Sequence, residues 1–119
     1  MIDEESSFLL RKSSLTNTQF NAFIIRMMKK GKISSDNYNE FSKIFRTRGA
    51  IAGSFTQAKN NIKESIYTIL LLFYLGVWKE KEKEILGSLI RGVMSMTSVD
   101  DEKKVEIKRY MERIIDMMI

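Results

Sequence analysis

The stretch SFTQAKNNIKESIYTILLLFYLG, residues 54–76, decides the fold class. Its apolar residues recur at helical spacing, and Ser54 with Gln57 three residues later has the spacing of a helix capping box. We therefore predict a long helix from Ser54 to Gly76. The first two turns are polar and basic and the last three are apolar nearly all round. We expect the N-terminal end to project and the C-terminal end to lie buried at the centre of the domain.

Similar periodic patterns on both sides of this stretch predict further helices. Two helices precede it. We expect the first from Thr16 to Gly31, with Thr16 and Gln19 forming a capping box, and the second from Ser34 or Ser35 to Gly49. Another helix lies on the C-terminal side, and we expect the alternating charges KEKEKE, residues 79–84, to be its solvated start.

The C-terminal residues 99–119 predict a last helix, capped by Ser98 and Asp101. Its apolar residues alternate at steps of four and three, the spacing of a heptad seam. We expect this seam either to form the interface of a homodimer or to pack on the domain as a terminal latch. Its residues are Ile107, Met111, Ile114 and Met118.

Length and composition agree with an all-α fold. The chain has 119 residues, enough for one domain with a modest core, and it contains no proline and six glycines, so the usual punctuation of an all-β chain is missing. We predict a single helical domain over residues 1–119, a compact bundle of about five helices, with residues 1–14 either as a flexible arm or as a docking segment.

The residue types narrow the possible chemistry. The absence of cysteine and histidine removes disulfides and thiolate chemistry and leaves only carboxylates as side-chain metal ligands. The candidate catalytic acids can all be explained as helix-start residues; they are Asp36, Glu40, Asp100 and Asp101. We therefore expect no enzyme activity, no metal and no cofactor.

The N-terminus and the longest apolar run bear on location. The chain begins with acidic residues rather than with a basic segment followed by an apolar one, so we expect no signal peptide. The run from Ile66 to Trp78 is shorter than the roughly 20 residues of a spanning helix. We expect no membrane association and a cytoplasmic, intracellular protein.

Charge is unevenly distributed along the chain. Residues 11–63 carry eleven basic residues against only Asp36 and Glu40, whereas residues 64–119 carry nine basic and ten acidic residues. A positive field confined to one part of a chain is typical of a surface that binds nucleic acid or an acidic partner.

The segment RTRGAIAGSFTQAKNN, residues 46–61, has no acidic residue and two glycines, Gly49 and Gly53. Glycines before a helix start at Ser54 would let the backbone approach a phosphate, which the free amides of the helix end attract. The alternative is an ordinary connection followed by a solvated first turn. The residues expected to contact nucleic acid are Arg46, Arg48, Ser54, Thr56, Gln57, Lys59, Asn60 and Lys63.

A second basic cluster, KKGK, lies at the end of the helix that begins at Thr16. Its lysines, Lys29, Lys30 and Lys32, are further candidates for phosphate contact. Equally, cations suit the C-terminal end of a helix and Gly31 suits a helix stop.

The segment ESIYTILLLFYLGVW, residues 64–78, resembles the end of the recognition helix in helix-turn-helix and winged-helix DNA-binding regulators. The resemblance implies that residues 54–67 lie in or near the major groove and that residues 38–48 form the preceding helix. Because KEKEKE lacks the apolar alternation and the turn residues of a β-wing, we expect a wingless helix-turn-helix-like core.

Three functions fit these features. The first is a small DNA-binding protein, a homodimeric helix-turn-helix-like regulator of transcription, with DNA favoured over RNA. The second is a helical structural subunit of a nucleoprotein complex, such as an RNA-guided effector or a replication assembly, that binds the nucleic-acid backbone. The third is a protein-interaction module whose basic surface meets an acidic partner.

Overall fold

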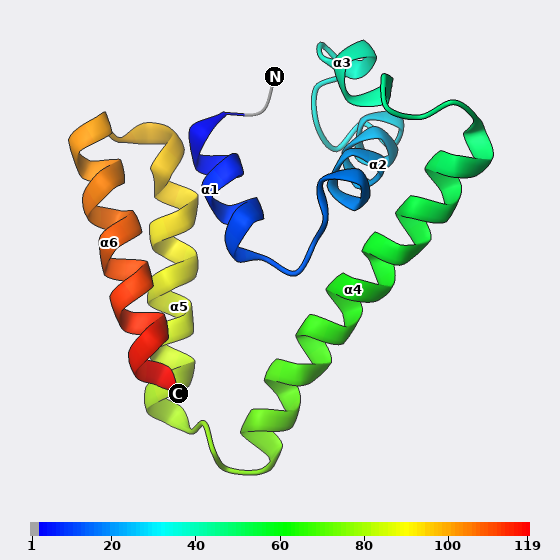
Figure 1. Ribbon diagram of the computed structural model, residues 1–119. Helices are drawn as coiled ribbons and strands as arrows, with labels where there is room; N and C mark the ends of the chain where they lie inside the picture. The colour runs from blue at the N-terminus through cyan, green and yellow to red at the C-terminus, as the bar shows by residue number, and fades with distance from the viewer. Residues whose placement is uncertain (1–2) are drawn as a thin grey trace. The chain divides into compact units, whose positions relative to one another are not determined.

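The computed structural model describes residues 3–119, which form six α-helices and one 3-10 turn with no strand among them (Figure 1). The all-α prediction is confirmed. The elements are α1 (Glu4–Lys12), α2 (Asn17–Lys29), α3 (Tyr38–Ser42), α4 (Arg48–Tyr74), α5 (Glu80–Ser95), the 3-10 turn η1 (Met96–Ser98) and α6 (Asp101–Met118).

The chain divides into two compact units, the first ending at Thr68 and the second running from Ile69 to Ile119. The boundary falls inside α4, which contributes its first turns to unit 1 and its last turns to unit 2. The single domain over residues 1–119 was inferred from chain length and stays a prediction.

Unit 1 has its core on α2. The capping box predicted there is present: the Gln19 amide donates to Thr16 Oγ1 at 3.1 Å, and the Thr16 amide donates to Gln19 Oε1 at 3.2 Å. The inner face of α2 buries Ala22, Ile25 and Met28. Helix α3 packs on α2, where the rings of Phe20 and Phe41 lie 6.3 Å apart between centroids.

Two elements of unit 1 differ from expectation. Residues 4–12, expected to be an arm or a docking segment, form α1, whose first turn is capped by the Ser6 amide donating to Asp3 Oδ1 at 2.7 Å; Met1 and Ile2 lie outside the described residues. The helix expected from Ser34 to Gly49 is only the five residues of α3. The Ser34 hydroxyl accepts from the Asp36 amide at 3.3 Å, a local turn that competes with helix formation.

Unit 2 is built on α5 and α6, which lie side by side and are joined through η1 (Figure 1). Its buried apolar residues are Trp78, Leu89, Met96 and Met111. The predicted helix after KEKEKE is confirmed as α5. The cap of α6 is Asp100, which accepts from the Lys103 amide at 2.8 Å, and not Ser98 or Asp101 as expected.

The burial expected for the long helix is reversed. Along α4 the buried residues are Phe55 and Ala58, both in its polar and basic part. In the apolar part, Ile66, Leu70 and Tyr74 are more than half exposed. The prediction that the C-terminal end of this helix is buried is therefore wrong, because the aromatic core of unit 1 forms against its N-terminal half instead.

Candidate nucleic-acid interface

Helix α4 begins six residues earlier than its sequence pattern indicates. The Ala50 amide donates to Thr47 Oγ1 at 3.0 Å, so Thr47 acts as the cap and Arg48 is the first helical residue. Gly49, Gly53 and Ser54 are therefore helical. The predicted glycine loop and the free amides at Ser54 are absent, because the helix is capped at Thr47. Ser54 and Gln57 have the spacing of a capping box but lie inside the helix.

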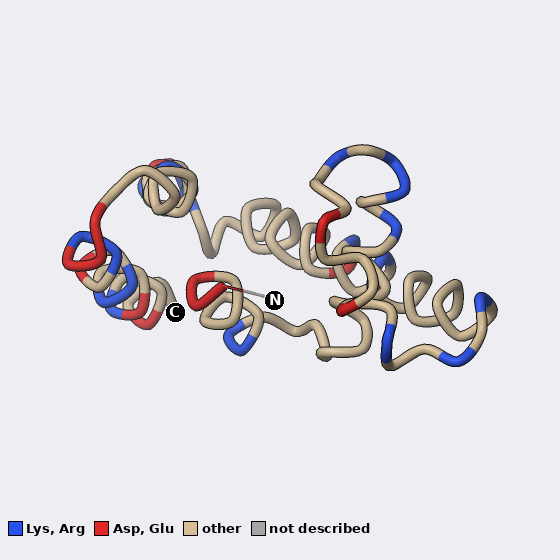
Figure 2. Tube along the Cα trace, turned by 90° about the horizontal axis from the view of Figure 1, so that it is seen from above, with Lys and Arg blue, Asp and Glu red and all other residues tan. Residues whose placement is uncertain are grey.

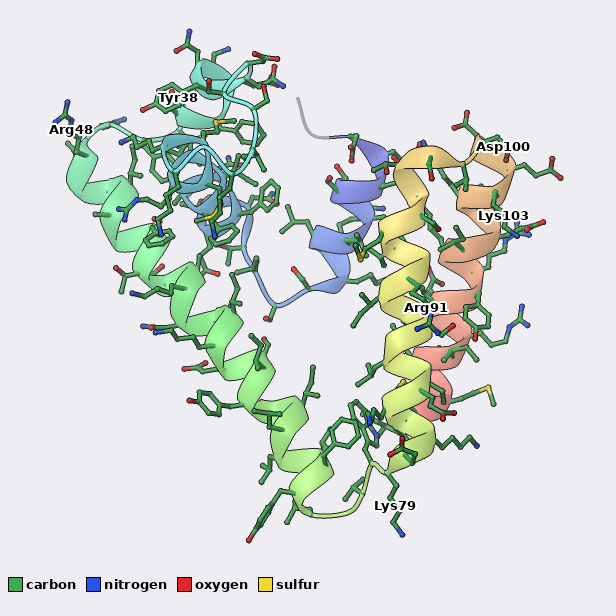
Figure 3. All side chains as sticks on the ribbon, turned by 180° about the vertical axis from the view of Figure 1, so that it is seen from behind. Tyr38, Arg48, Lys79, Arg91, Asp100 and Lys103 are labelled. Carbon is green, nitrogen blue, oxygen red and sulfur yellow. The ribbon has the colours of Figure 1, made fainter. Side chains whose placement is uncertain are left out.

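This earlier start places the predicted contact residues along one helix. Arg48, Lys59 and Lys63 fall within about 60° of one another around the helix axis, since each residue turns it by about 100°. All three are exposed, and Figure 3 shows the Arg48 side chain directed outward from the first turn of α4. The row from Arg48 to Lys63 is about 22 Å long at 1.5 Å per residue. We call these three residues the cationic face of α4.

Polar candidates lie beside this row. Thr56 and Asn60 are exposed at helical spacing with Lys59 and Lys63, and Gln57 is exposed on the neighbouring side. The Thr56 hydroxyl donates to the Ala52 carbonyl at 3.0 Å, so only its oxygen remains to accept a hydrogen bond. Ser54 is half-buried and offers the least accessible contact of the set.

Phe55 anchors α4 on α2 from the side that also carries the cationic face, since it falls about 20° from Arg48 and about 40° from Lys59 around the helix axis. The Phe55 ring stacks on Phe23 at 6.2 Å between centroids, with 11° between their planes. The Arg26 guanidinium lies over the Phe55 ring at 4.3 Å from its centroid. This cation–π contact makes Arg26 part of the packing between α2 and α4.

Asn61, at the end of the segment of residues 46–61, is a positioning residue. Its side-chain amide donates to the Ser14 carbonyl at 2.7 Å, and its Oδ1 accepts from the Ser14 hydroxyl at 2.6 Å. The same amide lies 3.4 Å from Gln19 Oε1. Asn61 therefore ties α4 to the segment that enters α2 and is not free to contact a ligand.

Most of the other candidate cations lie in the connections on both sides of α3, where Figure 2 shows Lys and Arg in blue. Lys29 ends α2, and Lys30 and Lys32 follow in an exposed turn. Gly31 has a φ of 71°, its amide donates to the Met28 carbonyl, and the Lys32 amide donates to the Met27 carbonyl. The predicted Gly31 stop is confirmed as a Schellman motif. Arg46 is exposed in the α3–α4 connection.

Unit 2 handles its charges differently. Its residues 69–119 contain nine basic and nine acidic residues, so the net charge of +5 belongs to residues 1–68. Its cations pair one turn away along their own helices, as in Lys103 Nζ to Glu106 Oε2 at 3.4 Å and Lys83 Nζ to Glu80 Oε1 at 3.5 Å. By contrast, residues 41–63 contain no acidic residue, and the first one that follows on α4 is Glu64.

The predicted seam of α6 packs within unit 2. Met111 is buried, and Ile107 lies close to α5, where a Cβ added at Gly92 would be 3.6 Å from Ile107 Cγ2. The Met118 carbonyl accepts from Trp78 Nε1 at 3.1 Å. Ile114 is half-buried. The latch alternative describes this packing, which leaves little of the seam for a second copy.

The predicted helix-turn-helix core has no direct support. Helix α3 has five residues, and residues 43–47 separate it from α4. No family model, no curated protein and no solved structure matches this chain. The resemblance of residues 64–78 to recognition helices stays a hypothesis.

Within residues 3–119, no three acidic side chains gather in a way that could hold a metal ion. None of the helices there combines the length and the apolar character required to span a membrane. Of the acids considered as catalytic candidates, Asp100 is engaged as the cap of α6.

Proposed function

We propose that this protein binds nucleic acid, with duplex DNA as the first ligand, through the cationic face of α4. The observation that carries the proposal is the row of exposed cations Arg48, Lys59 and Lys63 along a helix that the Phe55–Phe23 contact fixes on α2. Duplex DNA carries one negative charge per about 1.7 Å of its axis, so a row about 22 Å long passes several phosphates.

The contacts in this proposal are mainly to the phosphate backbone. Lysine and arginine side chains on phosphates fix register and orientation without reading sequence. The finer role, a DNA-binding regulator of transcription, adds base readout by Gln57 or Asn60, since amide side chains can pair with adenine in the major groove. Both side chains are exposed on α4, which is compatible with this role.

A structural subunit of a nucleoprotein complex is the second candidate. The brevity of α3 favours it, because a five-residue helix gives little of the support that a helix-turn-helix gives its recognition helix. Such a subunit would track a backbone of RNA or single-stranded DNA and would need no base contact.

The test is binding of labelled duplex DNA, single-stranded DNA and RNA over a salt series. The variant Arg48→Gln/Lys59→Gln/Lys63→Gln removes the cationic face of α4. Its matched control, Lys81→Gln/Lys83→Gln/Arg91→Gln, removes the same charge from exposed positions of α5. The first variant should lower the slope of log K against log salt by about 2–3, since each phosphate contact contributes about 0.9.

The outcomes separate the candidates. Equal losses in both variants would mean that only net charge matters and would remove the cationic face of α4 as a site. Preference for duplex DNA favours the regulator, and preference for RNA or single strands favours the structural subunit. Absence of binding to all three nucleic acids, together with binding to an acidic protein, would replace both with the protein-interaction module.

A further inference from the structure

The last turn of α4 and the residues directly after it expose an apolar surface that the packing of unit 2 leaves uncovered. Leu70, Leu71, Tyr74, Leu75 and Val77 are all more than half exposed, and Tyr74 reaches 88%. We call these five residues the α4 apolar surface. Single exposed apolar residues are normal on proteins, but a contiguous group of this kind usually marks an interaction site.

Local packing explains why this surface stays outside. The Phe73 and Trp78 rings meet edge-on at 5.8 Å between centroids. Trp78 is buried, and its Nε1 donates a hydrogen bond to the Met118 carbonyl. Gly76, with a φ of 75°, turns the chain so that the Val77 and Trp78 amides both donate to the Leu72 carbonyl. Phe73 and Trp78 thus supply the inward contacts of this segment.

The chemistry of the surface indicates its occupant. Residues 65–78 contain no charged side chain in a chain that is 29% charged. A nucleic acid or an acidic protein offers nothing complementary to such a stretch. A second chargeless apolar stripe does, because it loses no polar hydration on contact.

The size of the surface is that of one side of a protein interface. Five side chains of these types, exposed to this degree, present on the order of 600 Å², against about 800 Å² per partner in a standard complex. A two-fold axis brings the same patch of both copies together, as in an isologous dimer interface.

We propose that a second copy of this chain covers the α4 apolar surface, with the two α4 helices antiparallel across a two-fold axis. In that arrangement the two cationic faces point toward opposite ends. Each Lys63 lies about 15 Å along its helix from the middle of the surface, so the two Lys63 residues are roughly 30 Å apart. This exceeds the screening length of about 8 Å at physiological ionic strength, so the like charges do not oppose pairing.

The test uses the absence of cysteine from the chain. Tyr74→Cys introduces a single thiol near the proposed axis, and Ile115→Cys introduces one at an apolar position of α6 that is 53% exposed. Under mild oxidation Tyr74→Cys should form a disulfide-linked dimer at least tenfold faster than Ile115→Cys. Equal rates would overturn the proposal.

Light scattering gives an independent readout. The parent chain should be a dimer, and Leu71→Glu/Tyr74→Glu should halve the apparent mass while its helical circular dichroism is unchanged. Ile115→Glu should stay dimeric. A monomeric parent at about 100 μM, or a dimeric double variant, would overturn the proposal, as would a monomeric parent that binds neutral lipid vesicles through this surface. The inference does not depend on nucleic-acid binding, which the double variant's monomer should retain through its cationic face.

Discussion

The two halves of α4 differ in burial in the opposite sense to that which their composition predicts. In the polar and basic half, Phe55 is 8% exposed and Ala58 is fully buried, whereas in the apolar half Leu70 is 54% exposed. Phe55 has Phe23 and Arg26 packed on its ring, whereas more than half of Leu70 stays exposed. Burial is therefore decided by what packs opposite a side chain and not by the mean hydropathy of its segment.

Because of this difference, α4 exposes a cationic surface in one half and an apolar surface in the other. A cationic row suits a phosphate backbone, and a chargeless apolar stripe suits another apolar helix. The separation has a practical consequence: substitutions in one half should change one property and leave the other intact. The predictions below test each half against a matched position.

The largest expected effect is at Phe55. Phe55→Ala should lower the free energy of unfolding by about 3 kcal/mol or more, because it removes a buried ring that holds α2 and α4 together. The matched variant Tyr67→Ala, on the same helix at 70% exposure, should change it by no more than about 0.5 kcal/mol. Urea denaturation of both measures the contrast. Comparable losses would mean that the apolar half is buried after all.

The α6 seam should show the next largest effect. Met111→Ala should destabilise by about 2 kcal/mol, since Met111 is 5% exposed against α5, whereas Met117→Ala at 75% exposure should be nearly neutral. Thermal denaturation checks the difference, and light scattering should show an unchanged apparent mass. A Met111→Ala chain that keeps its stability but loses half its mass would restore the seam as the dimer interface.

The sequence predicted well the features that local hydrogen bonds determine. The capping box of Thr16 and Gln19 and the stop at Gly31 each depend on residues within one turn, so their spacing is sufficient to find them. The start of α4 was missed because Ser54 and Gln57 have the same spacing as a real capping box, and two nearby glycines read as a turn. Both glycines are tolerated because Phe55 and Ala58 are buried.

Features that depend on residues distant in the sequence could not be predicted from local spacing. Asn61 bonds to Ser14, 47 residues away, and nothing near Asn61 in the sequence indicates this. The heptad spacing of α6 correctly marked an apolar face, but not whether α5 or a second copy would cover it. Of the candidate site, the exposed cations were predicted as residues, and their alignment on one helix face followed only from the earlier helix start.

The smallest expected effect tests the backbone at the two ends of α4. Gly53 lies inside the helix, and a Cβ there would meet no atom within 4 Å, so Gly53→Ala should stabilise the protein by up to about 1 kcal/mol. Gly76 has a φ of 75°, so Gly76→Ala should destabilise it by about 1–2 kcal/mol even though space is available. Thermal denaturation gives the two signs directly. If Gly53→Ala destabilised the protein as Gly76→Ala does, residues 49–53 would be a turn, the row from Arg48 to Lys63 would be broken, and only Lys59 and Lys63 would remain on a common helix face.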